Sequence, residues 1–495
     1  MDQDGLDAWI ARQARFSAAA MLRAISATHL VKTRPGLGQT IRPARGSVLA
    51  SPETASGASA PDYFFHWLRD SAIVVDALRL PTEDGEAGPA AIEAIGDFVA
   101  FSLRLCRLDG PSLVLGGFRG AIDPARRADA RPDSELALIV GDRALGEARC
   151  NADGTLDSLG WSRPQHDGPA LRALTIMRLA RLAAFRDRAG ARVLLEADLD
   201  YTCAHWREAG YDPWEEIFGH HYYTRVVQHA ALAGGAQQMA KAGDDARAAA
   251  CAEAAAAILA TLDGFYDENA DAYLSCLPGA RAGTGALSQP RLDIAAPLAV
   301  IHAARDHGPH SLLDPRAFAT LRRLERLFAE KFAINRARGA ASAPALGRYA
   351  DDVYFDGGAW HFATLGAAQF YFRLAARLAA GSPLAVTPAN RDELAALLGA
   401  PAQALGAPRL EARWRKPLIV ALRARGDLFF ATTRAHTPAS GELSEQYDAA
   451  TGAPTSAANL AWSYAAFLSA AAARREAARL SSSDGAGGSA PWPRR

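Results

Sequence analysis

The chain has 495 residues, 49% of them hydrophobic, and its 54 Lys and Arg residues balance 54 Asp and Glu residues. This composition allows a large buried core, and the zero net charge gives no overall positive field to hold nucleic acid or an anionic membrane. The five cysteines show no CxxC spacing, which predicts free thiols in a reducing compartment rather than a disulfide framework or a zinc site.

The N-terminal segment does not read as an export signal. Acidic residues come first, and Arg12 and Arg15 interrupt any apolar run. No stretch reaches the ~18 uninterrupted apolar residues of a membrane span. We therefore expect a soluble, cytoplasmic protein that does not enter a membrane.

Helical periodicity dominates the rest of the chain. Apolar residues recur at three- and four-residue spacing in about a dozen segments, while the strict alternation typical of strands is scarce. Helices are expected over residues 18–27, 71–80, 92–105, 170–184, 191–206, 222–240, 246–262, 292–304, 317–332, 359–380, 410–431 and 457–478.

This pattern predicts an all-α protein. Length alone suggests about three domains, but no change of composition divides residues 1–478, so we expect one domain there. Residues 479–495 are rich in Gly, Ser and Pro and are expected to be disordered.

Several long connectors between the predicted helices are rich in tryptophan, tyrosine, arginine and acidic residues. They span residues 51–70, 151–168, 210–219, 347–358 and 441–457. Long loops on a rigid scaffold are where binding residues concentrate. Aromatic rings that stack on sugar C–H faces, beside Arg, Asp and Glu that bond to hydroxyls, are the mixture a carbohydrate site needs. Each tryptophan taken singly is more often a core residue.

Two carboxylates stand out as a possible acid and base. Glu215 follows Trp214 and precedes Glu216, and both a like charge and an aromatic wall favour the protonated form that a general acid needs. Glu445 lies between Ser444 and Gln446, whose donors favour an ionised base. Taken alone, the first cluster is more often the acidic start of a helix, and the second a polar loop.

Other chemistry has little support in the sequence. His220 and His221 are adjacent, and neighbouring residues on a helix point in different directions. The chain has no HExxH, no Walker sequence, no GxGxxG behind a strand and no GxSxG elbow. We expect neither a metal nor a cofactor.

Six segments, in order, resemble glucoamylases of glycoside hydrolase family 15. They are 61–71 (PDYFFHWLRDS), 161–173 (WSRPQHDGPALRA), 212–219 (DPWEEIFG), 347–360 (GRYADDVYFDGGAW), 444–448 (SEQYD) and 460–465 (LAWSYA). The resemblance covers about residues 6–475. It implies a single-domain (α/α)6 barrel of six inner and six outer helices, with the active site in a funnel at one end.

The resemblance also implies roles for individual residues. Glu215 matches the general acid and Glu445 the general base of an inverting, exo-acting enzyme that releases β-D-glucose from nonreducing ends of α-1,4-linked oligosaccharides or polysaccharides. Two carboxylates provide both proton transfers, so no metal is implied. The substrate-binding residues implied are Tyr63, Arg69, Asp70, Trp161, Trp214, Glu216, Arg348, Tyr349, Asp352, Trp360 and Trp462.

Departures from the family pattern leave other substrates open. Phe218 stands where fungal members usually have a small polar residue, beside Glu215 and Glu216. We also expect no starch-binding domain of the kind that fungal members often carry. One alternative keeps the fold and chemistry but acts on isomaltose, other α-1,6-glucosides or trehalose. Another is a non-catalytic barrel that binds carbohydrate or a protein. The oligomeric state is not predicted.

Overall fold

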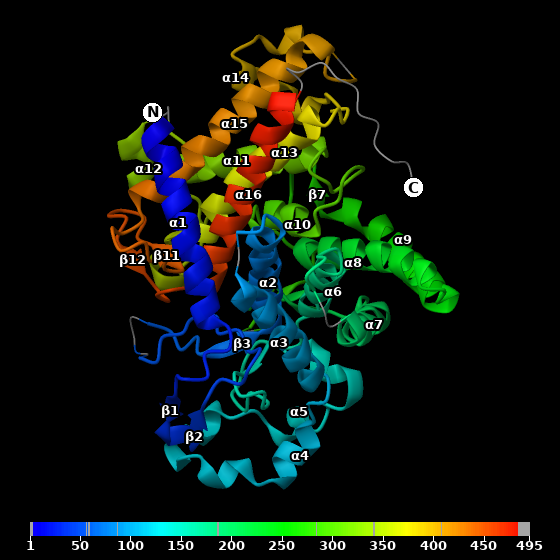
Figure 1. The fold of residues 1–495 in the computed structure, drawn as a ribbon, viewed down its shortest axis with the longest axis vertical. Helices are drawn as coiled ribbons and strands as arrows, with labels where there is room; N and C mark the ends of the chain where they lie inside the picture. Colours follow the sequence, from blue (N-terminus) through cyan, green and yellow to red (C-terminus); the bar gives the residue numbers. More distant parts are fainter. Residues whose placement is uncertain are drawn as a thin grey trace.

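The computed structural model describes residues 3–483, apart from 56, 58, 59, 87, 186, 187, 284, 340, 341 and 407. Within this part of the chain, six helices form an inner ring (Figure 1). Each contacts the next in chain order, and the last contacts the first, so the ring closes. The inner helices are α2 (Leu68–Glu83), α6 (Gly168–Leu179), α8 (Tyr222–Lys241), α10 (Ala295–Ala303), α13 (His361–Ala379) and α16 (Ala461–Ser483).

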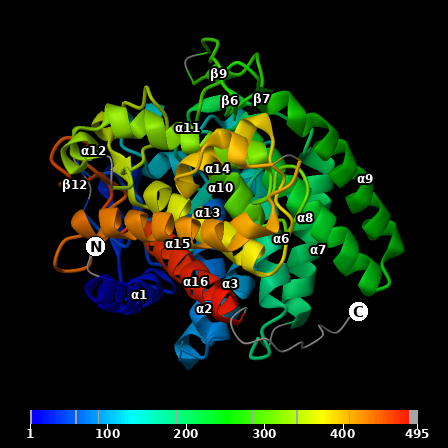
Figure 2. The same cartoon turned by 90° about the horizontal axis from the view of Figure 1, so that it is seen from above.

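Six further helices pack outside this ring and alternate with the inner helices along the chain. Figure 2 shows α1, α9 and α11 at the periphery and α10 and α13 near the centre. The arrangement is the (α/α)6 barrel that was predicted. The outer helices are α1 (Gln3–Ala24), α3 (Pro89–Leu105), α7 (Arg188–His205), α9 (Asp245–Leu262), α11 (Pro315–Lys331) and α15 (Ala412–Ala435).

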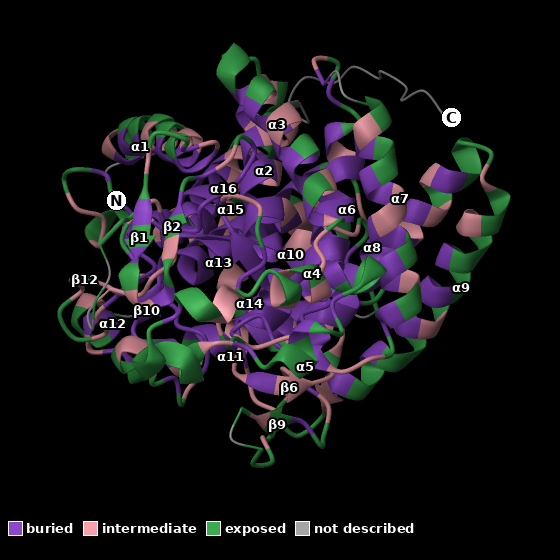
Figure 3. Ribbon diagram, turned by 90° about the horizontal axis from the view of Figure 1, so that it is seen from below, coloured by how far each residue is buried: buried purple, intermediate pink, exposed green. Residues whose placement is uncertain are grey.

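Inner and outer helices differ in how much of their surface is buried (Figure 3). Nearly every residue of α13 is buried, because neighbours surround it. Helix α9 buries only a stripe that includes Cys251, Ala255, Ile258 and Leu262, at the spacing of one helix face. In the described residues, Asp245–Phe265 is the one stretch long and apolar enough to cross a membrane by length and composition, and its stripe packs on α8.

Each predicted helix corresponds to one helix of the barrel, but several ends differ. Helix α1 begins at Gln3 rather than near residue 18, because acidic and basic residues on its exposed face obscure the buried stripe of Leu6, Ile10 and Gln13. Helix α16 continues to Ser483, so residues 479–483 of the predicted disordered tail are helical; residues 484–495 lie outside the described part. The short helices α4 (Gly110–Leu115), α5 (Asp133–Leu136), α12 (Ala333–Arg338) and α14 (Pro388–Leu398) were not predicted.

Short antiparallel strands fasten the loops at the N-terminal ends of the inner helices. Strand β3 runs directly into α2, and β10 runs directly into α13. Strand β3 pairs with β4, β5 with β6, β6 with β9, β10 with β11, and β11 with β12. These strands are β3 (Phe65–Trp67), β4 (Arg149–Asn151), β5 (Gly210–Tyr211), β6 (Ile217–Gly219), β9 (Arg281–Ala282), β10 (Ala359–Trp360), β11 (Gln446–Tyr447) and β12 (Pro454–Thr455).

Two further strand pairs and several 3₁₀ turns lie in the remaining connectors. The pairs are β1 (Lys32–Arg34) with β2 (Gln39–Ile41) and β7 (Tyr266–Asp267) with β8 (Ala272–Tyr273). The 3₁₀ turns are η1 (Pro35–Leu37), η2 (Phe118–Ala121), η3 (Pro124–Asp129), η4 (Gly141–Gly146), η5 (Asp263–Phe265), η6 (Tyr354–Gly357) and η7 (Ala402–Ala404).

Gly426 allows α15 to pack closely against α13. A Cβ atom there would lie 2.5 Å from the Phe372 ring. We expect Gly426→Ala to lower the free energy of unfolding by about 1–3 kcal/mol, because a filled core cannot take the extra methyl without strain. Urea unfolding, followed by circular dichroism, measures this change in the free energy of unfolding.

The matched control is Gly96→Ala, on outer helix α3, where an added Cβ meets nothing within 4 Å. That change should leave stability unchanged or raise it by up to about 1 kcal/mol, because alanine is the better helix former. Equal destabilisation by both substitutions would contradict close packing as the cause.

Candidate active site

A cavity of about 570 Å³ opens at the N-terminal ends of the inner helices. Arg69 and Asp70 reach it from the first turn of α2, Phe362 from α13 and Trp462 from α16. Every residue predicted for the site lines this cavity except Tyr349 and Asp352, which lie behind the wall. The predicted residues on the wall are Tyr63, Arg69, Asp70, Trp161, Trp214, Glu215, Glu216, Arg348, Trp360, Glu445 and Trp462.

Glu215 lies in the loop between β5 and β6 and is held by donors from two other loops. Its Oε1 accepts from Trp67 Nε1 at 2.7 Å and from Gln165 Nε2 at 2.9 Å, and its Oε2 accepts from Trp161 Nε1 at 2.6 Å. Arg69 lies 3.4 Å from Oε1. The backbone φ of +67° is uncommon for a residue with a side chain, and such strain is tolerated where the surroundings fix the conformation. The carboxyl therefore has one preferred orientation toward the cavity.

Glu445 has very different surroundings. Its side chain is buried, and Ser456 Oγ donates a short hydrogen bond to Oε2. Burial raises the pKa of Glu445 to about 7, although the hydrogen bond from Ser456 and the charge of Arg348 lower it. The sequence-based expectation that hydrogen-bond donors keep the pKa of Glu445 low is thus wrong, because burial outweighs the donors.

Glu216, which also lines the cavity, is held by three side chains. Arg348 donates to Oε1 at 2.8 Å, Tyr349 donates a short hydrogen bond to Oε2, and Arg291 donates to Oε2 at 3.2 Å. Asp352 in turn binds the Arg348 guanidinium with distances of 2.7 and 2.6 Å. Tyr349 and Asp352 therefore position charged groups of the wall and do not face the cavity themselves.

A second charged cluster surrounds Arg69. Its guanidinium donates to Gln165 at 2.8 Å and to Asp167 at 3.0 Å. Burial raises the pKa of Asp70 to about 6, since the neighbouring Arg69 offsets only part of the cost of burying the charge. Asp70 is thus a second cavity carboxyl that protonates well above the range of a free aspartate.

Stacked aromatic rings close the inner end of the cavity. Phe362 lies between Trp462, at 4.2 Å between ring centroids and 8° between planes, and Trp214, at 6.0 Å and 14°. Trp214 Nε1 donates to both oxygens of Asp293 at 3.0 Å. Because Phe362 and Trp462 also line a smaller cavity inside the barrel, this stack separates the two cavities.

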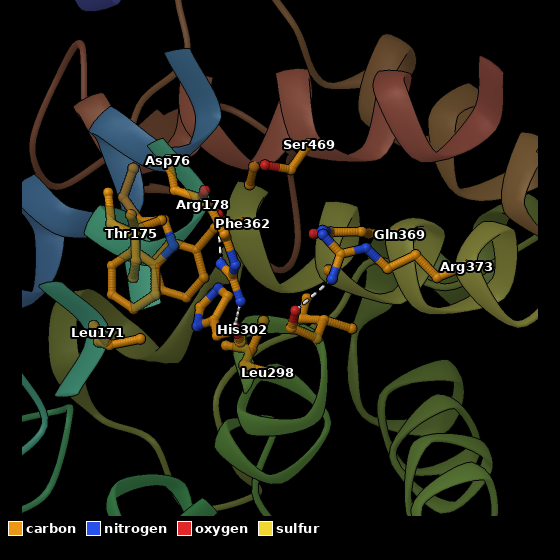
Figure 4. A pocket seen from close by; sticks show the side chains of 15 residues that line it. Asp76, Leu171, Thr175, Arg178, Leu298, His302, Phe362, Gln369, Arg373 and Ser469 are labelled. Atoms are coloured by element: carbon orange, nitrogen blue, oxygen red, sulfur yellow. Dashed lines mark hydrogen bonds and ion pairs between the residues drawn. The ribbon is translucent and has the colours of Figure 1, made fainter. Parts of the chain in front are cut away.

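A separate small cavity of about 30 Å³ lies inside the barrel beyond these rings (Figure 4). Phe362 and Trp462 contribute to the walls of both cavities. The other side chains around it include His302, Gln369 and Arg373. It has room for one or two water molecules and none for a sugar.

Several residues of the site were not predicted as site residues. Trp67 and Gln165 lay inside the motifs that carry the resemblance, so the signal was present. Ser456 and Arg291 belong to no motif, and only the folded chain brings them to Glu445 and Glu216. Phe218, beside Glu215 and Glu216 in sequence, does not line the cavity. Its ring packs on that of Tyr211, which does line it, with 5.3 Å between centroids.

The adjacent histidines take part in local hydrogen bonds. His221 Nε2 lies 3.2 Å from the Gly210 carbonyl, and His220 Nδ1 lies 2.8 Å from the Arg225 guanidinium. Among the described residues, no three His, Cys, Asp or Glu side chains are grouped as metal ligands.

Sequence comparison identifies the family. A family model described as "Glycosyl hydrolases family 15" matches residues 32–87 and 132–472, and the chain belongs to this family. It is a glycoside hydrolase of the glucoamylase type.

Three of its relatives are 26–29% identical to this chain. Glucoamylase-1 of Schizophyllum commune is 29% identical over 445 residues, which cover 87% of this chain and 69% of that protein. Glucoamylase-1 of Arthroderma benhamiae is 29% identical, with 89% of this chain and 65% of that protein covered, so the chain spans about two thirds of the length of these relatives. The solved glucoamylase of Hormoconis resinae superposes with a TM-score of 0.77 at 26% identity, covering 95% of this chain and 74% of that one.

Ser456 provides a test of how the site sets the acidity of Glu445. Its hydrogen bond lowers the pKa of Glu445, so Ser456→Ala should raise that pKa further. If Glu445 must be ionised to act, kcat/KM falls as pH decreases through this pKa, and the acidic limb should move to higher pH by about one unit. The measurement is kcat/KM on an α-glucoside between pH 4 and 9.

The control is Ser440→Ala, because this serine is exposed, lies on the same connector and donates its hydroxyl to Glu442 at 3.3 Å. Its pH profile should match that of the wild type. An acidic limb that stays in place in Ser456→Ala would contradict the assigned coupling between Ser456 and Glu445.

Proposed function

We propose that the protein is an inverting, exo-acting α-glucosidase that releases β-D-glucose from the nonreducing ends of α-1,4-linked oligosaccharides or polysaccharides. The observation that carries this proposal is the pair of carboxyls, Glu215 and Glu445, on one cavity. They come from loops far apart in sequence and have contrasting surroundings.

In the proposed reaction, Glu215 protonates the glycosidic oxygen while Glu445 removes a proton from a water on the opposite face of the sugar. Attack of that water inverts the anomeric centre, so an α-linked substrate gives β-glucose. Near neutral pH, a group with a pKa of about 7 is both substantially ionised and basic enough to accept a proton. The hydroxyls of Tyr63 and Tyr354, 2.7 Å apart, lie near Glu445 and suit the binding of that water.

The cavity wall supports recognition of a terminal sugar. Arg69, Asp70 and Arg348 offer paired donors and acceptors for hydroxyl groups, and Glu216 is assigned to the leaving-group side. The tryptophans Trp161, Trp360 and Trp462 offer faces for sugar C–H bonds. A cavity closed at its inner end by the Trp462–Phe362 stack admits a chain end and not the middle of a chain, which supports exo action. Its volume lies within the roughly 300–1,000 Å³ of small-molecule sites.

A second candidate keeps this chemistry but changes the linkage, to α-1,6 as in isomaltose or to trehalose. The observation that favours it is the Tyr211–Phe218 ring pair, in which Tyr211 contributes to the wall near Pro213 and Gly283. A bulky ring pair there restricts how the leaving sugar is oriented. A non-catalytic barrel is the weaker alternative, because both carboxyls are present in a glycoside hydrolase of family 15.

We also propose a cytoplasmic location and one catalytic domain over residues 1–478. All five cysteines are free thiols, as in proteins of reducing compartments. The closed ring of inner helices draws on segments from residue 68 to residue 483 and supports a single domain.

Isosteric amides test the two catalytic assignments. Glu445→Gln and Glu215→Gln should each lower kcat by about 10²–10⁴-fold on maltooligosaccharides, because each removes one proton transfer. Glucose release measured over time gives the rates. Glu442→Gln, an exposed glutamate three residues before the proposed base, is the matched control and should keep wild-type activity. Full activity in Glu445→Gln would show that another group is the base.

The stereochemistry is tested on freshly released product, and the linkage preference is tested on a panel of disaccharides. Proton NMR within the first minutes, before mutarotation, should show β-glucose first from maltotriose. Initial α-glucose would contradict inversion. In a panel of maltose, isomaltose and trehalose, the highest kcat/KM on maltose is expected; a preference for isomaltose or trehalose would support the second candidate instead.

A further inference from the structure

Two cysteines face each other across the packed outer helices α7 and α9. Cys203 lies near the C-terminal end of α7 and Cys251 in the first half of α9, and their Sγ atoms are 3.8 Å apart. The other thiols are placed differently: Cys106 donates to the Ser102 carbonyl, and Cys150 lies near the His66 carbonyl. The pair therefore differs from Cys106 and Cys150, whose sulfurs lie next to backbone carbonyls.

The two thiols differ in access to solvent, and this gives each a separate role. Cys203 is partly exposed, whereas Cys251 is fully buried. The hydrogen bond between them lowers the pKa of Cys203, and Arg247 lowers it further. The same hydrogen bond raises the pKa of Cys251. A reagent in solution thus meets Cys203 first, and the thiolate is the form that attacks.

We propose that Cys203 and Cys251 form an intramolecular disulfide when a small-molecule disulfide, such as glutathione disulfide, is in excess. The Cys203 thiolate attacks one sulfur of the oxidant, forming a mixed disulfide and expelling one small thiolate. Cys251 then gives up its proton, and its sulfur attacks Cys203 Sγ and expels the second small thiolate. In total, the two protein thiols lose two electrons and two protons. The small-molecule disulfide gains them and is reduced to two thiols.

The geometry requires little movement. A disulfide has its sulfurs about 2.05 Å apart, so the two Sγ atoms must approach by roughly 1.8 Å. Side-chain rotation of two neighbouring cysteines on contacting helices can supply most of this distance. Neither cysteine lines the substrate cavity.

The position of the bond predicts its effect. It would enclose the segment 204–250, which carries the Glu215 loop and inner helix α8. Closing a loop of about 50 residues restricts the unfolded chain and stabilises the folded one. Oxidation should therefore raise Tm by roughly 3–6 °C for a chain of this size, and a dithiol reductant should reverse the rise.

The experiment uses the full chain, incubated with glutathione disulfide and then denatured for thiol titration. Five thiols are expected before oxidation and three afterwards, with the Cys203 and Cys251 peptides linked in a digest. Five thiols after oxidation, or a glutathione adduct that persists on Cys203 of the wild type, would overturn the proposal.

Substitutions separate the roles of the two thiols. Cys251→Ser should trap glutathione on Cys203, and Cys203→Ser should keep all four remaining thiols and show no gain in Tm. The matched control is Cys106→Ser, which removes another partly exposed thiol and should still form the bond and gain the Tm shift. Loss of two thiols in Cys203→Ser would show that a different pair reacts. If a variant does not fold, the presence or absence of linked Cys203 and Cys251 peptides in the oxidised wild type still decides whether the disulfide forms.

Discussion

The contact between α16 and α2 closes the ring of inner helices, and the site depends on that closure. The backbone N–H of Ala461 donates to the Ala50 carbonyl at 2.8 Å, and Ser51 Oγ donates to the Ala458 carbonyl at 2.7 Å. These bonds join the loop before the first inner helix to the loop before the last one. Because of them Glu445, late in the chain, shares a cavity with Arg69 and Asp70, near its start.

Burial of acidic groups is the main electrostatic cost of this site. Burial raises the pKa of Asp212 and Glu445 to about 7 and that of Asp70 and Asp293 to about 6. The folded chain therefore holds protons that the unfolded chain has released between about pH 4 and pH 7. These groups make the folded state less stable as pH rises through that window. Such carboxyls are tolerated where catalysis needs acids that titrate near neutral pH.

A buried cation supports the orientation of Trp161, which donates to Glu215. The buried Arg149 guanidinium lies 3.5 Å from the centre of the Trp161 ring and 5.1 Å from that of Trp67. Asp157 binds Arg149 at 2.8 Å, and burial lowers the pKa of Arg149 in spite of that partner. The cation is desolvated, which strengthens its attraction to both ring faces. The Arg149 guanidinium thus helps to fix the rings of both Trp67 and Trp161, the two indoles that donate to Glu215.

The sequence by itself determined the helical segments, and the resemblance of its motifs to family 15 implied the barrel and the general location of the site. Apolar residues at helical spacing record which faces are buried, so all twelve barrel helices could be predicted, and local motifs carried Glu215, Glu216 and Arg348. Only the tertiary structure decided that the pKa of Glu445 is raised, because burial is set by segments distant in sequence. The same reason explains why Ser456 and the distance between Cys203 and Cys251 could not be predicted: no local pattern encodes contacts between separate elements.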